Sequence, residues 1–207
     1  MLHPDTELRF VDATIGHGVF ATRPIPKGTV TWVRDALDQT FSPAALARFE
    51  PDLRAQLDRY TYVDGRGDYV LCWDLARYLN HACEATCLSP GYGFEVAVRD
   101  IAADEELTDD YGTLNLDAPF RCRCGSPKCR GDIGPDDLLL YGDRWDALLA
   151  SAFAELPRVA QPLWALVREK DELARLAARA APPASCRLNH HPRPTSPRRH
   201  ANHPIAR

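Results

Sequence analysis

The chain has 207 residues, of which 45% are hydrophobic and 26% charged, with a formal net charge of −4. This length allows about one domain with appendages, and the ordinary charge balance argues against nucleic-acid binding by the whole molecule. The apolar runs are too short to span a bilayer, and the first residues do not resemble a secretion signal. We therefore expect a cytoplasmic protein without a membrane partner, whose seven cysteines are metal ligands or buried thiols.

Short strands joined by turns are predicted over the first half of the chain. Alternating or β-branched residues predict strands at 8–13, 19–22, 29–33, 60–63, 69–73, 94–99 and, after a turn, within 101–108. Ser42 and Pro43 predict the start of a helix that Pro51 kinks or divides. The Gly-containing turn over 64–67 favours a hairpin between its two flanking strands. A short helical turn is expected over 74–81.

Helical patterns replace the strands near the C-terminus. Helices are predicted at 136–141, 145–156 and 163–180, and the second carries an apolar stripe typical of a packed face. From Pro182 the chain is rich in proline, arginine and histidine and has no acidic residue, which predicts a disordered basic tail. The pattern therefore predicts a mixed α+β architecture, mainly β, with a C-terminal helical extension.

Three closely spaced cysteines, Cys122, Cys124 and Cys129, suit a single metal ion. Three thiolates leave a tetrahedral Zn²⁺ one ligand short. The missing ligand is expected upstream, where Cys83 is favoured and Cys87 is the alternative. Such a pairing would fold a C-terminal flap back onto an upstream loop and place a site where the two meet.

Four motifs, taken in order, resemble those of SET-domain protein lysine methyltransferases with a post-SET zinc segment. They read Gly-His-Gly-Val-Phe-Ala at 16–21, Arg-Tyr-Leu-Asn-His-Ala-Cys at 77–83, Glu-Glu-Leu-Thr-Asp-Asp-Tyr-Gly at 105–112, and Cys-Arg-Cys-Gly-Ser-Pro-Lys-Cys at 122–129. The resemblance covers roughly residues 5–132. It implies a β-clip-like fold of small curved sheets around a knot-like crossing, where the Asn-His segment passes beneath a loop of the later segment.

The resemblance also divides the chain into regions. It implies a SET domain at 1–115 with a variable insert at 36–68 and a post-SET zinc segment at 116–132. The helical extension at 133–181 and the tail at 182–207 lie outside it. The peptide groove is expected beside the insert. The extension is expected to pack on the core, with a dimer seam as the alternative, so that both monomer and dimer remain open.

The implied activity is methyl transfer from S-adenosylmethionine to the ε-amine of a lysine in a histone or non-histone protein. Tyr111 would be the catalytic residue, ordering the reactants through its hydroxyl. Binding of the cosubstrate is implied for Gly16, His17, Gly18, Arg77, Asn80 and His81. A structural Zn²⁺ site is implied for Cys83, Cys122, Cys124 and Cys129. Arg77 could equally form a structural ion pair, and Asp110 is expected to hold its loop.

Two departures from the family pattern stand out. The cysteine motif continues as Glu84, Ala85 and Thr86, where relatives often carry an acidic residue, proline and asparagine, so we expect a looser loop with weaker hydrogen bonding. Asp109 occupies a position that is often aromatic and influences how many methyl groups fit on the lysine. A nearby negative charge raises the pKa of an amine, so we do not expect Asp109 to accelerate methyl transfer.

Two other functions compete with this hypothesis. A SET-like zinc scaffold with weak catalysis would act through protein contacts, and the two departures motivate it. A nucleic-acid-binding zinc ribbon would suit the cysteines and the basic tail, but it leaves the Asn-His and Asp-Tyr-Gly motifs unexplained. Nucleic acid is therefore expected as a partner only through the tail.

Overall fold

The structure, a computed structural model, describes residues 1–192. The strands of this part are β1 (Thr6–Asp12), β2 (Gly16–Ala21), β3 (Val30–Val33), β4 (Gln39–Phe41), β5 (Thr61–Val63), β6 (Tyr69–Leu71), β7 (Asn80–His81), β8 (Cys87–Leu88), β9 (Phe94–Ala97), β10 (Glu106–Asp109), β11 (Phe120–Arg121) and β12 (Asp132–Ile133). The helices are α1 (Pro43–Leu46), α2 (Pro51–Tyr60), α3 (Asp137–Phe153) and α4 (Lys170–Ala178). Short 3-10 turns are η1 (Leu75–Tyr78), η2 (Tyr111–Thr113), η3 (Leu156–Arg158), η4 (Trp164–Leu166) and η5 (Cys186–Asn189). The predicted mixed architecture of small sheets with few helices is confirmed.

A four-stranded sheet in the order β1-β2-β10-β7 carries parts of three of the sequence motifs side by side. The β1–β2 hairpin is antiparallel, and β10 adds to β2 antiparallel, so the fully buried Val19 and Leu107 lie opposite each other. β10 then pairs parallel with β7, which places Thr108 beside Asn80 and Asp109 beside His81. This pairing joins the two segments that the resemblance places at the crossing.

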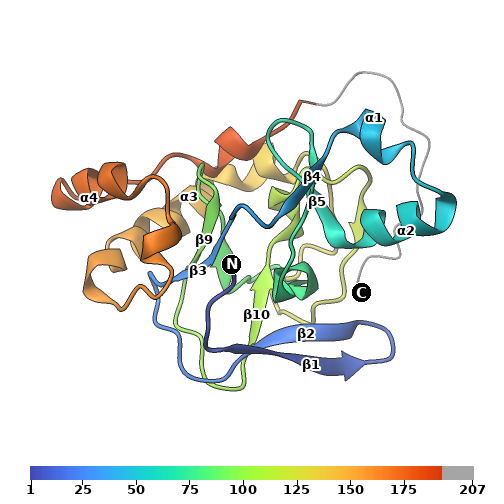
Figure 1. The fold of residues 1–207 in the computed structure, drawn as a ribbon. Helices are drawn as coiled ribbons and strands as arrows, with labels where there is room; N and C mark the ends of the chain where they lie inside the picture. The colour runs from blue at the N-terminus through green and yellow to red at the C-terminus, as the bar shows by residue number, and fades with distance from the viewer. Residues whose placement is uncertain (193–207) are drawn as a thin grey trace.

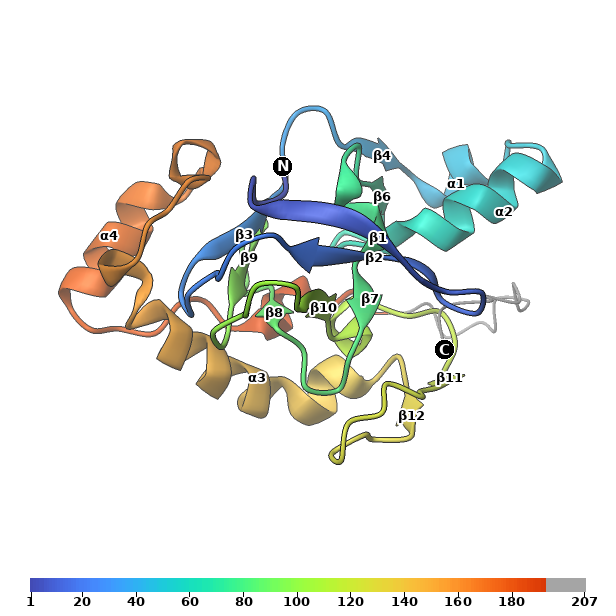
Figure 2. The same ribbon diagram turned by 90° about the horizontal axis from the view of Figure 1, so that it is seen from below.

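A second sheet, β3-β9-β8, packs its apolar face against α3. Val30, Phe94 and Val96 from the sheet share one core cluster with Trp145 and Leu149 from the helix. Figures 1 and 2 show α3 running along this sheet, with α4 at one end of the molecule and the α1–α2 pair at the other. The extension therefore covers the SET core, as expected.

Strands β4 and β5 of the insert form a small sheet with β6, which directly follows the insert, next to α1 and α2. Ser42 caps α1 with its hydroxyl and Pro43 begins the helix, as predicted. Pro51 begins α2, so it divides the predicted helix in two. The predicted hairpin of β5 and β6 is confirmed by their antiparallel pairing.

The helical extension differs from its prediction in two places. α3 is one continuous helix through Gly142, where two helices were predicted. A Cβ at Gly142 would lie 2.7 Å from Cζ of Arg187, so the missing side chain makes room for a packed guanidinium. The predicted helix at 163–180 is shorter, because only Lys170–Ala178 is α-helical and η4 precedes it.

The prediction of disorder from Pro182 is wrong for residues 182–192. Asp146 of α3 accepts hydrogen bonds from the Ser185 hydroxyl (2.6 Å) and the Cys186 amide (2.8 Å), and these bonds anchor η5. The Cys186 side chain is fully buried against Gly142. Composition missed these contacts because one polar cap and one small thiol suffice to hold the segment. Residues 193–207 of the predicted tail lie outside the described part.

None of the described helices combines the length and the apolar character that a membrane span requires.

Candidate functional site

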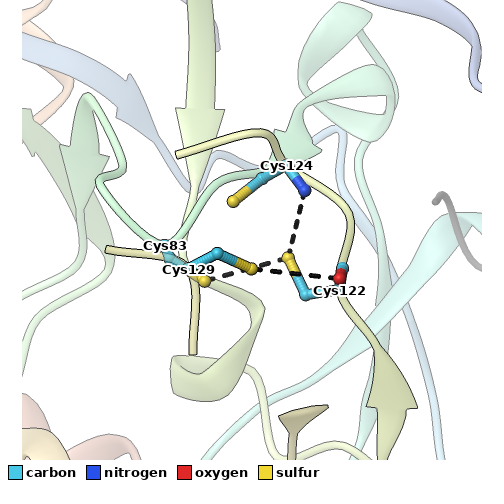
Figure 3. A group of neighbouring side chains, drawn as sticks. All are labelled: Cys83, Cys122, Cys124 and Cys129. Carbon is cyan, nitrogen blue, oxygen red and sulfur yellow. Dashed lines mark hydrogen bonds between the residues drawn. The ribbon is translucent and has the colours of Figure 1, made fainter. Parts of the chain in front are cut away.

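The four cysteine sulfurs lie within 4.8 Å of one another, as Figure 3 shows. The β11–β12 hairpin brings its three cysteines together, with the Cys122 amide bonded to the Gly131 carbonyl at 2.7 Å. Cys83 reaches them from the loop after β7, and its sulfur lies 3.8 Å from that of Cys122. Zinc with Zn–S bonds of about 2.3 Å requires tetrahedral sulfur–sulfur edges of about 3.8 Å. The thiol set therefore fits a Cys₄ zinc site.

Cys83 is the fourth member of the cluster, as the sequence favoured. The alternative, Cys87, lies on β8 and is fully buried beside the Thr86 hydroxyl. Amide groups of Arg130 and Gly131 donate to the sulfurs of Cys83 and Cys129 at 3.4 Å each. Such N–H···S contacts suit thiolate ligands, because they stabilise negative charge on sulfur.

The loop after Cys83 is firmly bonded, which corrects the expectation that its departures loosen it. Glu84 accepts hydrogen bonds from the Ser126 hydroxyl (2.6 Å) and the Lys128 amine (2.7 Å), and so clamps the zinc segment to the loop. Thr86 accepts from the Thr108 amide through its hydroxyl (2.8 Å) and donates to the Thr108 carbonyl through its amide (3.1 Å). Threonine thus anchors this loop to β10 where relatives often use asparagine.

The residues predicted to bind the cosubstrate converge at the β2–β10–β7 edge. Asn80 donates from Nδ2 to the His17 carbonyl (3.1 Å) and to Oε1 of Glu106 (2.7 Å). The approach is so close that a Cβ on Gly18 would lie 2.1 Å from that carboxylate oxygen. Gly16 has φ +86°, a conformation that glycine adopts freely. The Asn-His segment and the early glycine motif therefore touch directly.

His81 joins this edge to the zinc segment and to Tyr111. Its Nδ1 accepts a hydrogen bond from the Tyr111 amide (3.1 Å), and its ring packs against Phe120 with centroids 5.6 Å apart. Burial lowers the pKa of His81 to about 4, against the opposing field of Asp110. A neutral imidazole is therefore fixed here at physiological pH.

Arg77 is held by its own turn. Its guanidinium donates to the carbonyls of Asp74 (3.1 Å) and Trp73 (2.5 Å) and lies over the Tyr78 ring. These contacts favour the structural reading of Arg77, although the residue also borders the cavity described next. Its part in cosubstrate binding stays a prediction.

Tyr111 stands between two parts of the site. Its hydroxyl donates to the Leu79 carbonyl at 2.7 Å, and its ring lies 5.5 Å from His81. Burial raises its pKa, so the phenol is protonated and able to donate. Asp110 holds the turn as expected, accepting from the Gly112 amide at 3.1 Å. Beyond Tyr111 a cavity opens.

The cavity has a volume of about 530 Å³ and is bordered by the insert. Its lining includes Arg59 to Tyr62 beside Leu79 and Tyr111, where a peptide groove was expected. Gly16, Gly18, Asn80 and His81 lie outside this lining. Tyr111 therefore contacts the edge that carries these residues through His81 and borders the cavity with its own side chain.

Sequence reasoning missed three contributors to the site. Glu95 lies in a strand read as alternating, yet all four residues of β9 are buried and Glu95 lines the cavity. Leu188 and Asn189, assigned to the tail, line the cavity as well. An acidic residue flanked on both sides by apolar residues was the one available signal for Glu95, because a central strand is covered on both faces.

Comparison with known proteins agrees with this geometry. Residues 16–112 match the SET domain family, so the chain contains a SET domain. It is similar to the histone-lysine N-methyltransferase ash1 of Drosophila melanogaster (31% identity over 141 residues, 61% of this chain and 6% of that protein). It is also similar to human EHMT1 (32% over 138 residues, 56% and 10%) and to an H3 lysine-4 specific enzyme of Candida albicans (39% over 67 residues, 28% and 6%). The chain thus spans at most a tenth of the length of these relatives.

Proposed function

We propose that the chain is an S-adenosylmethionine-dependent protein-lysine N-methyltransferase. One observation carries the proposal, which is the position of Tyr111 between the Asn80–His81 edge and a cavity bordered by the insert. Its hydroxyl donates a hydrogen bond to the Leu79 carbonyl, and its amide donates one to His81. A bound cosubstrate supplies an electrophilic methyl group. Its chemistry asks the protein mainly to align an amine behind that methyl and to exclude water.

Each part of the chain has a task in this proposal. The backbone at Gly16, His17 and Gly18, with Asn80 and His81, holds the methyl donor at the edge of the sheet. The Tyr111 hydroxyl and the Leu79 carbonyl orient the amine where it enters from the cavity. Four cysteines hold a structural Zn²⁺ with no open position, so its work is to dock the segment that carries Phe120.

The substrate is proposed to be a protein bearing a target lysine, with histones as the first candidates. The support is that the relatives named above are histone-lysine methyltransferases. The alternative of a weakly catalytic scaffold loses one of its two motivations, because Glu84 and Thr86 form the contacts that tighten their loop. A cytoplasmic location stays part of the proposal.

The test uses the purified chain with labelled S-adenosylmethionine and either core histones or a cell lysate. Wild type should transfer label to lysine, and Tyr111→Phe should lose at least about a hundredfold in rate while still binding the cosubstrate in calorimetry. Tyr141→Phe is the control: it removes a tyrosine hydroxyl on α3, away from the site, and should keep the activity. A wild-type chain that neither binds the cosubstrate nor labels any protein would rule the proposal out.

A further inference from the structure

Two carboxyl groups meet in a buried part of the cavity lining. Glu95 comes from β9 and Asp109 from β10, and their residues are only 6% and 5% exposed. A hydrogen bond joins the two carboxyl groups. Tyr111 follows Asp109 by two residues and lines the same cavity. The pair therefore lies beside the tyrosine that the proposed function places at the reacting amine.

One atom of this pair is left without a partner among the described residues. Oε2 of Glu95 accepts no hydrogen bond, and Nε1 of Trp32, its neighbour across the β3–β9 ladder, donates none. Both residues line the cavity. A buried polar atom without a partner costs roughly 1–3 kcal/mol, so such atoms facing a cavity point to a polar ligand. An acceptor in an acidic pocket suits the N–H groups of an amine.

The charge state of the pair follows from its burial. Burial raises the pKa of Glu95 well above its usual range, and raises that of Asp109 to about 6. Glu95 therefore keeps its proton and donates a hydrogen bond to Asp109, which is ionised at neutral pH. The pair carries one negative charge and can accept one further proton.

Several ionisable groups surround the pair among the described residues. The ionisable groups facing the pair are Cys72, Cys87, Tyr62, Tyr111, Asp74, Asp110 and the N-terminal amine. Burial raises the pKa of both thiols and both phenols, so they stay neutral. Asp110 is occupied by Arg130 through two hydrogen bonds.

We propose that the Glu95–Asp109 pair is the proton acceptor for the substrate lysine, an inference that rests on the proposed function. Asp109 takes a proton from the lysine ammonium, so that both carboxyl groups become neutral acids. The freed lone pair on Nζ then forms the bond to the methyl carbon, while the electron pair of the broken C–S bond stays on sulfur. The products are a methylated ammonium and a neutral thioether.

Burial changes what is expected of Asp109. A lone, solvated carboxylate holds an ammonium in its charged form, which opposes methyl transfer. Burial raises the proton affinity of Asp109 although the hydrogen bond from Glu95 lowers it, and the amine's own pKa falls in a dry cavity beside a cationic sulfonium. The two affinities approach each other, which is the condition for efficient general-base catalysis.

The test is the pH profile of kcat/KM for labelled methyl transfer to the protein substrate found above. Wild type should rise through about pH 6, where Asp109 ionises, and then stay level up to the lysine pKa of about 10. Asp109→Asn should lose about 10²- to 10⁴-fold at neutral pH and keep rising towards about pH 10, since only free amine then reacts. Glu95→Gln still donates to Asp109, so its loss should be smaller.

Two controls separate proton acceptance from positioning. Asp117→Asn removes the same charge from the cavity wall and should leave the shape of the profile unchanged. A peptide with S-aminoethylcysteine in place of lysine has a more acidic amine, and it should reduce the deficit of Asp109→Asn. Cosubstrate calorimetry checks that each variant is folded.

Each outcome decides a different claim. An Asp109→Asn variant that keeps the wild-type profile, or loses the same factor at every pH, overturns the inference and leaves the proposed function standing. A wild-type profile without an inflection near pH 6 overturns it even if the variants do not fold. A wild type without transfer or cosubstrate binding refutes the proposed function itself, and this inference with it.

Discussion

The guanidinium of Arg130 binds the carboxylate of Asp110 through two hydrogen bonds of 2.6 and 2.7 Å. Both side chains are buried, and Arg130 also donates to Asp137 at 3.2 Å and lies over the ring of Trp145. Arg130 follows the last cysteine of the cluster, whereas Asp110 precedes Tyr111. One arginine therefore connects the zinc segment, the Asp-Tyr-Gly motif and α3.

Replacing Arg130 with methionine should destabilise the protein by about 3–5 kcal/mol, because the buried Asp110 charge loses its partner. The stability of Arg130→Lys should lie between those of wild type and the methionine variant, since an amine keeps the positive charge but cannot form the paired hydrogen bonds. The measurement is urea unfolding. Arg121→Met, which breaks an exposed pair with Asp132, is the control and should change stability by less than about 1 kcal/mol. Equal losses in the two methionine variants would contradict the assigned role.

Cys83→Ser should lose bound zinc, whereas Cys87→Ser should keep it. The reason is that the Cys83 sulfur lies 3.8 Å from that of Cys122, while Cys87 lies on β8 outside the cluster. Elemental analysis of the purified chains measures the metal per molecule, independently of activity. Zinc retained in full by Cys83→Ser and lost by Cys87→Ser would reverse the assignment.

Gly18→Ala should weaken cosubstrate binding by about tenfold, the worth of a lost hydrogen bond. The new methyl group would lie 2.1 Å from Oε1 of Glu106 and 3.0 Å from Nδ2 of Asn80, so the hydrogen bond between them must break. Calorimetric titration with S-adenosylmethionine measures the effect. Gly134→Ala, whose nearest neighbour would be 3.6 Å away, should bind normally. Unchanged affinity in Gly18→Ala would remove this edge from the binding site.

Asp109→Asn should be more stable than wild type at pH 7 and about equally stable near pH 4. The pKa of Asp109 is raised to about 6 by burial, so folding opposes its ionisation. The resulting penalty is absent below the unfolded pKa, grows as pH rises through about 6, and reaches up to about 3 kcal/mol. Urea unfolding of both chains at the two pH values measures the difference. A gap that does not depend on pH would show that Asp109 ionises freely in the fold.

Much of the site could be predicted because its residues lie in short contiguous motifs. The cysteine spacing indicated one metal ion, and Cys83 was favoured as the fourth ligand because it belongs to the Asn-His-Ala-Cys motif. What could not be predicted depends on contacts between distant segments. The strand at 94–99 was predicted from its alternation, which cannot reveal that the strand is covered on both faces and that Glu95 is buried.

The C-terminal errors have the same origin. Two helices were predicted at 136–141 and 145–156, but the guanidinium of Arg187 fills the space beside Gly142 and one helix continues. Cys186 lies in a segment of disordered composition, and its order depends on Asp146, 40 residues earlier. Local composition contains no information about such partners.

The packing of α3 sets how much of the chain must be kept together for recombinant work. The family match ends at residue 112, yet the apolar face of β3 and β9 is covered by Trp145 and Leu149. A chain cut between these points would expose that face to water and invite aggregation. Recombinant chains should therefore retain α3, and η5 with it, because Asp146 of α3 anchors that segment.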